Sequence, residues 1–358
     1  MRTMFIGFVI LMLSASFSFA LEKEEFERQW NAAESKDAKL ALATEVIASA
    51  TDLDEIRSIQ DMWEDYNRDS ALEFFTARAD ENRTAENLYL LGRLQDDPSE
   101  SISLATKSIE ADPSFTYAYR LLVVTYMNNL FDAEEDGEHY ATLKASFDRD
   151  FPLMEQIRDY LPDDGGAWGL LYEALVYRKD YANQLKCLDR GKGLEQRWAS
   201  VQGYTNAYVG LGDYAVARAK LEEMLDERIA DDRLEPEMRE EVRLYRYFTA
   251  LEYVGAWDEA IRYFKSYDGE ELATSAKIYL ATAYLNSGKK NKAIKALEDA
   301  AELGFDTASE LTDYGDFDDL MDHRKWDDLI ASVKQNRIDS APERRAELLA
   351  KRMDLAAP

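Results

Sequence analysis

The stretch NAYVGLGDYAVARAKL (Asn206–Leu221) contains two helical runs joined by a short turn. The first run ends in aromatic and leucine residues, the turn carries glycine followed by an acid and an aromatic, and the second run has alanine near its middle. This pattern occurs four times between Gly166 and Gly304 and decides the fold. The four turns are RKDY (178–181), GLGDY (210–214), VGAW (254–257) and NSGKK (286–290).

The turns are regularly spaced along the chain. If Lys179, Gly212, Gly255 and Gly288 are equivalent, they stand 33, 43 and 33 residues apart. A period in the low thirties with two helices per unit is typical of a helical solenoid, in which each repeat packs on the next. The longer spacing contains a charged segment, residues 226–240, which we expect to form a longer loop or lengthened helix ends.

Composition agrees with an all-α protein that has a large core. Of 358 residues, 46% are hydrophobic and 12% aromatic, with only 7 prolines and 16 glycines. The formal net charge of −28 repels phosphate backbones, so neither nucleic-acid binding nor a polybasic membrane patch is expected. One cysteine excludes an intramolecular disulfide, and two histidines argue against a histidine-rich metal site.

The N-terminus has the pattern of a signal peptide. A basic residue precedes the apolar run MFIGFVILML (residues 4–13), which is too short to span a membrane. Small or weakly polar residues follow, with Ser18 and Ala20 at the −3 and −1 positions of a cut before Leu21. We therefore expect a cleaved signal peptide at residues 1–20, export to the periplasm or beyond, and no later membrane insertion. The alternative is an uncleaved N-terminal anchor.

Breaks in the sequence divide the remaining chain into regions. The clearest break is PDDGG at residues 162–166. Amphipathic runs at 53–63 and 70–79 predict helices, and Phe151-Pro152 is expected to start an additional helix that ends at Leu161. The expected regions are an N-terminal helical region at 21–112, a helical repeat region at 113–165, the clear repeats at 166–302, a C-terminal segment at 303–336, and a tail at 337–358 with a final helix at 342–353.

Large and small residues recur at matching positions of four units. They are Trp168, Leu171 and Tyr181; Tyr208, Gly212, Asp213, Tyr214, Ala217 and Leu221; Gly255, Trp257, Ala260 and Phe264; and Tyr284, Gly288, Ala293, Leu297 and Ala300. This pattern resembles the tetratricopeptide repeat (TPR) family, although Gln184 and Gly191 replace the two alanines of the first unit. The resemblance implies an all-α, right-handed α-solenoid of antiparallel helix pairs, a TPR-like superhelix.

The segment after the last repeat has a pattern of its own. It contains AAELGF (300–305), DFDDL (316–320) and RKW (324–326). It looks like the closing segment of many bacterial TPR proteins, which caps the last repeat by covering its apolar side and presenting a polar one to water. The residues expected on its buried side are Phe317, Leu320, Trp326 and Leu329.

The resemblance also implies which side binds a partner. In the family the concave groove is lined by residues of each first helix that lie off the core stripe. Here these positions are polar and aromatic, which suits a protein segment or peptide held by hydrogen bonds and ring contacts. The paired basic residues of the carboxylate-clamping members are not evident. The expected peptide-binding residues are Glu173, Tyr177, Gln202, Asn206, Tyr245, Thr249, Tyr253, Thr282 and Asn286.

No side chains form a recognisable catalytic or metal-binding pattern. Cys187 lies between apolar neighbours and has no histidine near it in sequence, so we expect a buried hydrophobe rather than a nucleophile. His139 and His323 lie among acids and are expected at the surface. The acidic run at 316–322 lacks the spacing of a calcium loop, so helix capping and solvation are preferred over Ca²⁺ binding. No catalytic residue, cofactor or metal site is predicted.

The preferred hypothesis is an exported TPR-type scaffold that binds a protein or peptide on its concave face. Docking on a preformed surface needs no chemistry of its own. The alternative is an accessory subunit of a cell-envelope enzyme or transport system, in contact with glycan through its aromatic rings. An enzyme in its own right is disfavoured because acid–base pairs are not evident.

Overall fold

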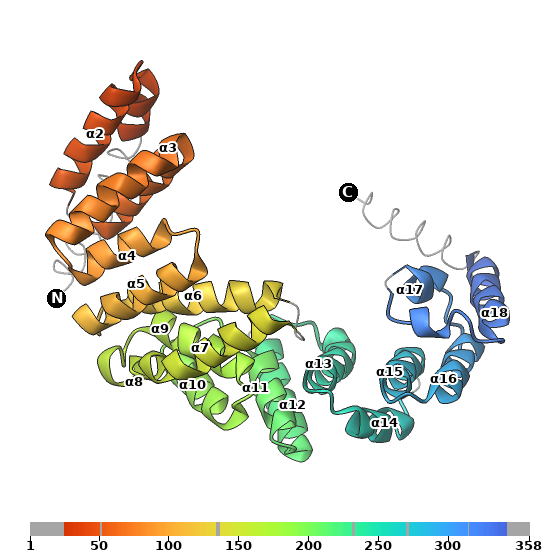
Figure 1. The fold of residues 1–358 in the computed structure, drawn as a ribbon. Coiled ribbons are helices and arrows are strands. Elements are labelled where there is room, and N and C mark those ends of the chain that lie inside the picture. Colours follow the sequence, from red (N-terminus) through yellow and green to blue (C-terminus); the bar gives the residue numbers. More distant parts are fainter. Residues whose placement is uncertain are drawn as a thin grey trace, which may run out of the picture. The chain divides into compact units, whose positions relative to one another are not determined.

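The computed structural model describes residues 25–50, 52–133, 137–230, 233–269, 272–313 and 315–341. These residues form helices that pack in antiparallel pairs, with no strand among them (Figure 1). The all-α solenoid of helix pairs expected from the sequence is therefore confirmed. The chain divides into two compact units, Met1–Ala174 and Leu175–Pro358. The expected signal peptide (1–20) and final helix (342–353) lie outside the described residues.

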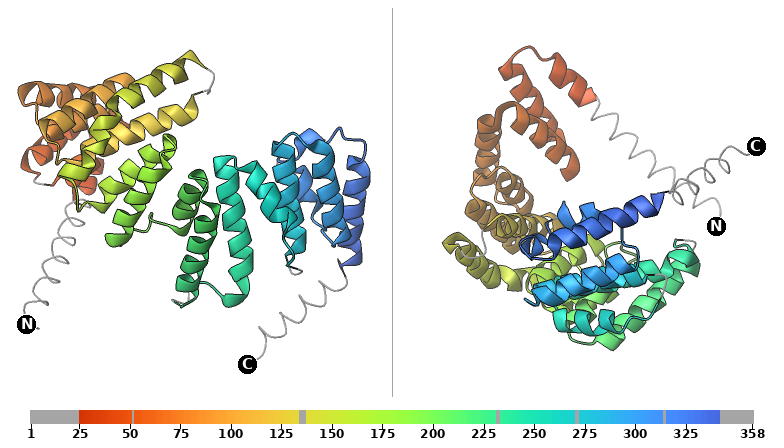
Figure 2. Two further views of the ribbon diagram at one scale, coloured as in Figure 1. Left: turned by 90° about the horizontal axis from the view of Figure 1, so that it is seen from below. Right: turned by 90° about the vertical axis from the view of Figure 1, so that its right-hand side faces the viewer.

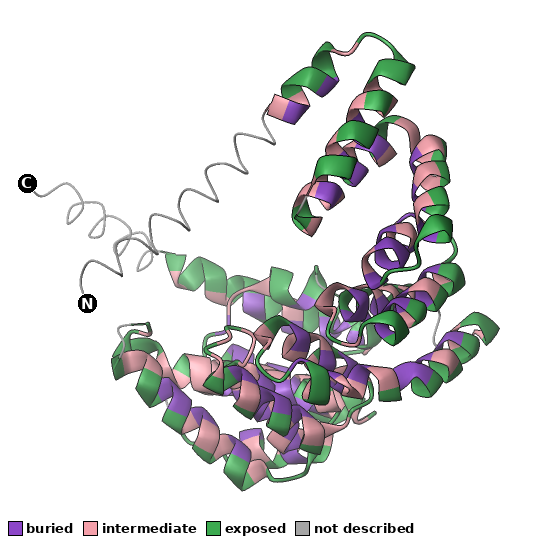
Figure 3. Cartoon of the chain, turned by 90° about the vertical axis from the view of Figure 1, so that its left-hand side faces the viewer, coloured by how far each residue is buried: buried purple, intermediate pink, exposed green. Residues whose placement is uncertain are grey.

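The first unit contains the N-terminal helices. After a helix at residues 25–32, the chain forms α2 (Lys36–Ser49), α3 (Leu53–Glu81), α4 (Ala85–Arg93), α5 (Pro98–Ala111), α6 (Thr116–Asp132), α7 (Glu138–Glu155), α8 (Ile157–Tyr160) and the first part of α9 (Gly165–Tyr177). Consecutive helices pack against each other, most extensively α4 on α5 and α5 on α6. Most helices bury one side and expose the other (Figure 3), so the core of the unit follows the stack.

Polar residues fix where several of these helices begin. Ser35, Asp52, Thr84 and Asp97 are N-caps whose side chains accept a hydrogen bond from a backbone N–H of the first turn. Within α3, Asn67 departs from helical geometry, with φ −161° and ψ 84°. The two amphipathic runs of the sequence are thus two helical segments joined at a kink.

The expected helix from Phe151 to Leu161 is wrong at its start. α7 continues through Pro152 to Glu155, and the short α8 follows. Phe147, Phe151 and Met154 are buried on one side of α7. The free energy gained by burying these apolar side chains outweighs the free energy lost with the one backbone hydrogen bond that a proline removes.

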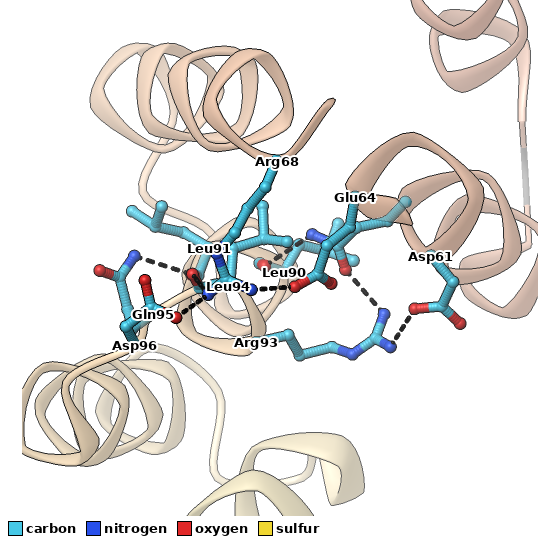
Figure 4. A network of polar contacts seen from close by, with 10 residues as sticks. Asp61, Glu64, Arg68, Leu90, Leu91, Arg93, Leu94, Gln95 and Asp96 are labelled. Atoms are coloured by element: carbon cyan, nitrogen blue, oxygen red, sulfur yellow. Dashed lines mark hydrogen bonds and ion pairs between the residues drawn. The ribbon is translucent and has the colours of Figure 1, made fainter. Parts of the chain in front are cut away.

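Polar side chains tie α3 to α4 in the first unit (Figure 4). The buried amide of Gln60 donates to the carbonyl of Leu90 at 2.8 Å and accepts from Arg93 at 2.7 Å. Arg93 also pairs with Asp61 at 2.6 Å, and Arg68 donates to a carbonyl at the end of α4 at 2.6 Å. Because buried polar groups are costly unless partnered, this network fixes how the two helices pack.

The second unit alternates first and second helices of successive pairs, which stand side by side in Figure 2. The longer segment expected at 226–240 comprises both an extended end of α12 and a 3₁₀ turn, η1. The elements are α10 (Tyr181–Gly193), α11 (Val201–Gly210), α12 (Tyr214–Ala230), η1 (Pro236–Met238), α13 (Arg239–Val254), α14 (Trp257–Lys265), α15 (Ala273–Asn286), α16 (Lys290–Glu302), α17 (Ala308–Thr312), η2 (Asp318–Leu320) and α18 (Trp326–Asp339).

The four turns that define the repeat share one backbone conformation. Gly212, Gly255 and Gly288 have φ angles of 77°, 76° and 70°, and Lys179 has a φ of 56°. This left-handed region is easily reached by glycine and costs other residues free energy. The equivalence inferred from spacing is therefore confirmed, and Lys179 carries a Cβ where the other three turns have none.

Small residues stand where the paired helices cross. Ala217, Ala260 and Ala293 are completely buried, as expected for close approach of two helices. At the matching position of the first unit, Gln184 is also completely buried and donates to the carbonyl of Leu175 at 3.0 Å. A polar side chain is tolerated there because its amide bonds to the end of the preceding helix.

The segment after the repeats closes the stack of the second unit. Its expected buried residues, Phe317, Leu320, Trp326 and Leu329, are each no more than 6% exposed. Asn336 of α18 reaches back and donates to the carbonyl of Ala301 at 2.7 Å and to that of Phe305 at 2.9 Å. The segment therefore covers the end of α16 with apolar side chains and is held there by the hydrogen bonds of Asn336.

Candidate functional site

The first helices of the second unit, α11, α13 and α15, form a row. α13 packs against α11 on one side and α15 on the other, while α12, α14 and α16 each pack against their own first helix. One side of the row is therefore left to solvent, and we call it the first-helix face. It is defined by the exposed and half-buried residues Gln202, Asn206, Glu241, Tyr245, Thr249, Glu252, Tyr253, Thr282 and Asn286.

α13 contributes most of the first-helix face. Its core side buries Leu244, Tyr247, Phe248 and Leu251. Its opposite side carries polar and aromatic residues at helical spacing. Tyr245 is 51% exposed and Tyr253 is 46% exposed. Exposed tyrosines combine a large apolar ring with a polar tip, which suits them to anchor a partner.

The polar residues of α11 bond partly to each other. The side-chain amide of Gln202 donates to Asn206 at 2.7 Å and to the backbone carbonyl of Arg246 at 3.2 Å. The second of these contacts links α11 to α13. The structure thus brings two of the predicted residues together, and part of their hydrogen-bonding capacity is used within the protein.

Three other predicted residues bond to their own helices. The hydroxyl of Thr249 donates to the carbonyl of Tyr245 at 2.8 Å, and that of Thr282 donates to Ile278 at 3.2 Å. Asn286 donates to the carbonyl of Thr282 at 3.0 Å. Their oxygen atoms keep lone pairs with which to accept hydrogen bonds from a partner.

The two predicted residues of α9 fall in different units. Tyr177 belongs to the second unit and is half-buried. Glu173 belongs to the first unit, where partial burial raises its pKa and Arg120 acts in the opposite direction. The nine predicted residues are therefore divided between the two units, and the first-helix face is defined within the second unit alone.

The pKa of one acid on the first-helix face is raised by its surroundings. Partial burial and the carboxylate of Asp316 both raise the pKa of Glu252. Glu252 lies on α13, whereas Asp316 follows α17, beyond α15 in the row. The negative charge of a residue after α17 therefore acts on a carboxyl group of α13, although the two are more than sixty residues apart in sequence.

Two residues of the first-helix face and one ring on the neighbouring helix were not among the predicted binding residues. Glu241 and Glu252 lie on the exposed stripe of α13, and Tyr279 of α15 stacks on Phe248 with ring centroids 4.3 Å apart. Burial raises the pKa of Tyr279, and the charge of Glu241 adds to the effect. Helical spacing along α13 could have predicted Glu241 and Glu252. The repeat-family positions used to choose binding residues include only part of that stripe.

The cysteine and histidines considered as possible catalytic groups lie on different helices or loops. Cys187 is completely buried and His139 is exposed, as expected. His323 is half-buried, and its Nε2 lies 3.0 Å from the side-chain oxygen of Asn291. Among the described residues, no three His, Cys, Asp or Glu side chains converge as metal ligands do. Within the same ranges, each helix is too short or too polar to cross a membrane.

No protein-family model matches this chain, and no curated protein sequence matches it. Among solved structures it is similar to human IFIT1, in a dimer with PPP-AAAA, with a TM-score of 0.37 and 10% identity over 75% of this chain and 60% of that chain. It is also similar to a structure of Naa15/Naa10 bound to HypK-THB, with a TM-score of 0.21 and 13% identity over 89% of this chain and 64% of that chain. The chain thus spans less than two thirds of these longer chains, and the likeness concerns the helical fold alone.

Proposed function

We propose that this chain is an exported, non-catalytic scaffold of the TPR type that binds an extended segment of a protein partner on the first-helix face. The observation that carries the proposal is the pair of exposed tyrosines, Tyr245 and Tyr253, on one side of α13. Tyrosine is enriched among residues that dominate binding energy, and its ring loses little conformational entropy on binding. The partner would meet a surface whose helices are already packed, which limits the ordering cost of association.

Export is part of the proposal and rests on the sequence of residues 1–20. The basic residue, the apolar run and the small residues before Leu21 support cleavage at that point. N-terminal sequencing of the protein from a periplasmic fraction is expected to start at Leu21. A chain that keeps residues 1–20 and sediments with membranes would contradict this part of the proposal.

A photo-crosslinking side chain at Thr249 tests the binding face. Thr249 lies between the two exposed tyrosines, whereas Val216, 46% exposed on α12, serves as the control position. We expect mass spectrometry to identify one stoichiometric partner from Thr249 and none from Val216. In a Tyr245→Ala, Tyr253→Ala chain the yield should fall about tenfold, as expected when hot-spot residues are truncated. Equal recovery from both positions would contradict the proposal.

The alternative is an accessory subunit that contacts glycan in the cell envelope. The same exposed tyrosine rings favour it, because sugars stack on aromatic faces. Sedimentation with purified murein, lost in the Tyr245→Ala, Tyr253→Ala chain, would favour glycan over a protein partner.

A further inference from the structure

The arginines at the start of α13 turn away from the first-helix face. Arg239 pairs with Glu222 at 2.5 Å and with Asp226 at 2.8 Å, and both acids lie on α12. Arg243 pairs with Glu222 at 3.5 Å and also with Glu240 of its own turn. These two cations are therefore held by the second-helix layer and are not available on the exposed side of the row.

Neither neighbouring first helix supplies a free cation to the face. Lys277 of α15 lies 3.8 Å from Asp299 of α16, its second helix, and α11 contains no charged residue. Arg246 is the cation of α13 that remains beside the face. One of its Nη atoms lies 3.5 Å from the side-chain oxygen of Gln202, and its guanidinium carbon lies 5.8 Å from the centre of the Tyr245 ring. It thus already has partners within the protein.

Four acidic side chains on or near the face form no salt bridge within the described residues. Glu241 and Glu252 of α13, Glu310 of α17 and Asp316 after α17 are all exposed. Within the described ranges, none of these four forms an ion pair or a hydrogen bond through its side chain. Partial burial raises the pKa of Glu252, and the negative charge of Asp316 adds to this effect. Like charges held together without counter-charges raise the free energy of the surface until a cation neutralises them.

We infer that the partner segment is cationic, an extended chain whose arginine or lysine side chains pair with Glu241, Glu252, Glu310 and Asp316 while its apolar groups lie against Tyr245 and Tyr253. This inference rests on the proposed function and names the chemistry of its partner. An arginine also stacks on tyrosine rings and bonds a carboxylate with two parallel N–H groups. An anionic or purely apolar segment would leave the four carboxylates unpaired.

Fluorescence anisotropy with designed peptides tests the charge requirement. The probe is a short labelled peptide in which arginines alternate with Gly, Ser and Leu, and its control has glutamine in place of each arginine. We expect the full chain to bind the arginine peptide at least tenfold more tightly than the glutamine peptide, with an affinity that falls as salt is raised. Equal binding of the two peptides would overturn the inference.

Matched charge variants separate the face from the overall negative charge. Glu241→Gln with Glu252→Gln removes two carboxylates of the face, whereas Asp268→Asn with Glu302→Gln removes two exposed, unpaired carboxylates that follow or end the second helices α14 and α16. The first pair should weaken binding of the arginine peptide roughly tenfold, and the control pair less than about twofold. An equal loss in both variants would show that the peptide binds anywhere on an acidic protein.

The crosslinking experiment separates failure of this inference from failure of the proposed function. If Thr249 captures a protein whose yield is unchanged by Glu241→Gln with Glu252→Gln, the face binds a partner that is not cationic, and only the inference falls. If Thr249 captures no protein and the arginine peptide does not bind, both fall. A crosslink from Thr249 to a second copy, or to residues 342–358 of the same chain, would identify another occupant and overturn the inference.

Discussion

The ring of Tyr181 lies directly against Gly210, so closely that a Cβ atom at Gly210 would come within 2.5 Å of three ring carbons. Tyr181 begins α10, and Gly210 ends α11. A helical glycine normally destabilises a helix, so its presence here reflects the close approach of an aromatic ring from the preceding pair.

Replacing Gly210 with alanine should therefore destabilise the protein. The clash with Tyr181 is expected to outweigh the better helix propensity of alanine, for a net loss of about 1–2 kcal/mol in the free energy of unfolding. Gly193→Ala is the matched control, because nothing lies within 4 Å of a Cβ atom at that position of α10. It should raise stability by up to about 1 kcal/mol. Urea denaturation followed by circular dichroism measures both, and a stabilised Gly210→Ala chain would contradict the packing described.

The turn at Lys179 should be improved by glycine. Lys179 has a φ of 56°, whereas the equivalent turns carry glycine. Lys179→Gly is expected to raise stability by about 1 kcal/mol, since a left-handed conformation costs a residue with a Cβ roughly that amount. Gly212→Ala, at a φ of 77° with open space around its Cβ position, should lower stability by a similar amount. Thermal denaturation of the two single variants compares them, and changes of the same sign would refute the equivalence of the turns.

A buried phenol–carboxylate bond should make stability depend on pH. Tyr126 donates to Asp150 at 2.6 Å, and Asp150 is 7% exposed. Burial acts to raise the pKa of Asp150, but hydrogen bonds from Arg149 and Tyr126 outweigh it and the pKa is lowered. Tyr126→Phe should cost about 1.5–3 kcal/mol at neutral pH, as expected for a hydrogen bond to a charged group.

The sign of this pH dependence follows from the lowered pKa. The stabilising contribution of Asp150 is present above its unfolded pKa of about 3.9 and is lost as the pH falls through the lower folded value. The difference between the natural chain and Tyr126→Phe should shrink as the pH falls below about 4. Tyr119→Phe is the control, because Tyr119 donates to the backbone carbonyl of Pro113, which does not titrate in this range. A similar pH dependence in both variants would argue against the account given for Asp150.

Cys187 should react with thiol reagents only after unfolding. Its side chain is completely buried in α10, and a thiolate must be accessible to attack the reagent. We expect labelling by a chromogenic disulfide to be slow in buffer and complete in concentrated urea. Rapid labelling of the folded chain would show that α10 opens locally far more often than the rest of the unit.

The repeat could be predicted because its signals are local. A glycine turn, as at Gly255, needs a conformation that few other residues adopt, and a crossing alanine such as Ala260 needs a small side chain; both requirements leave a mark in sequence. The helix start at Phe151-Pro152 was predicted wrongly because the deciding interaction is not local. The local preference of Pro152 to begin a helix was overruled by burial of the stripe that continues through α7.

The candidate site could be predicted only in part. Helical spacing places Tyr245, Thr249 and Tyr253 on one side of α13, and the structure agrees. Spacing does not reveal that Gln202 bonds to a neighbouring helix, or that the charge of Asp316 acts on the pKa of Glu252. Such contacts depend on how whole helices pack, which no single helix encodes.

The bond from Gln202 to the carbonyl of Arg246 has a consequence for how a bound chain would be recognised. It holds α11 and α13 together before any partner arrives, so the separation between groups on the two helices is set in advance. A row of helices fixed in this way presents its binding groups at constant spacing. It would therefore discriminate among partners by the spacing of their side chains as well as by the type of side chain. An insertion of one residue into a bound segment would move the next side chain out of register with its binding group.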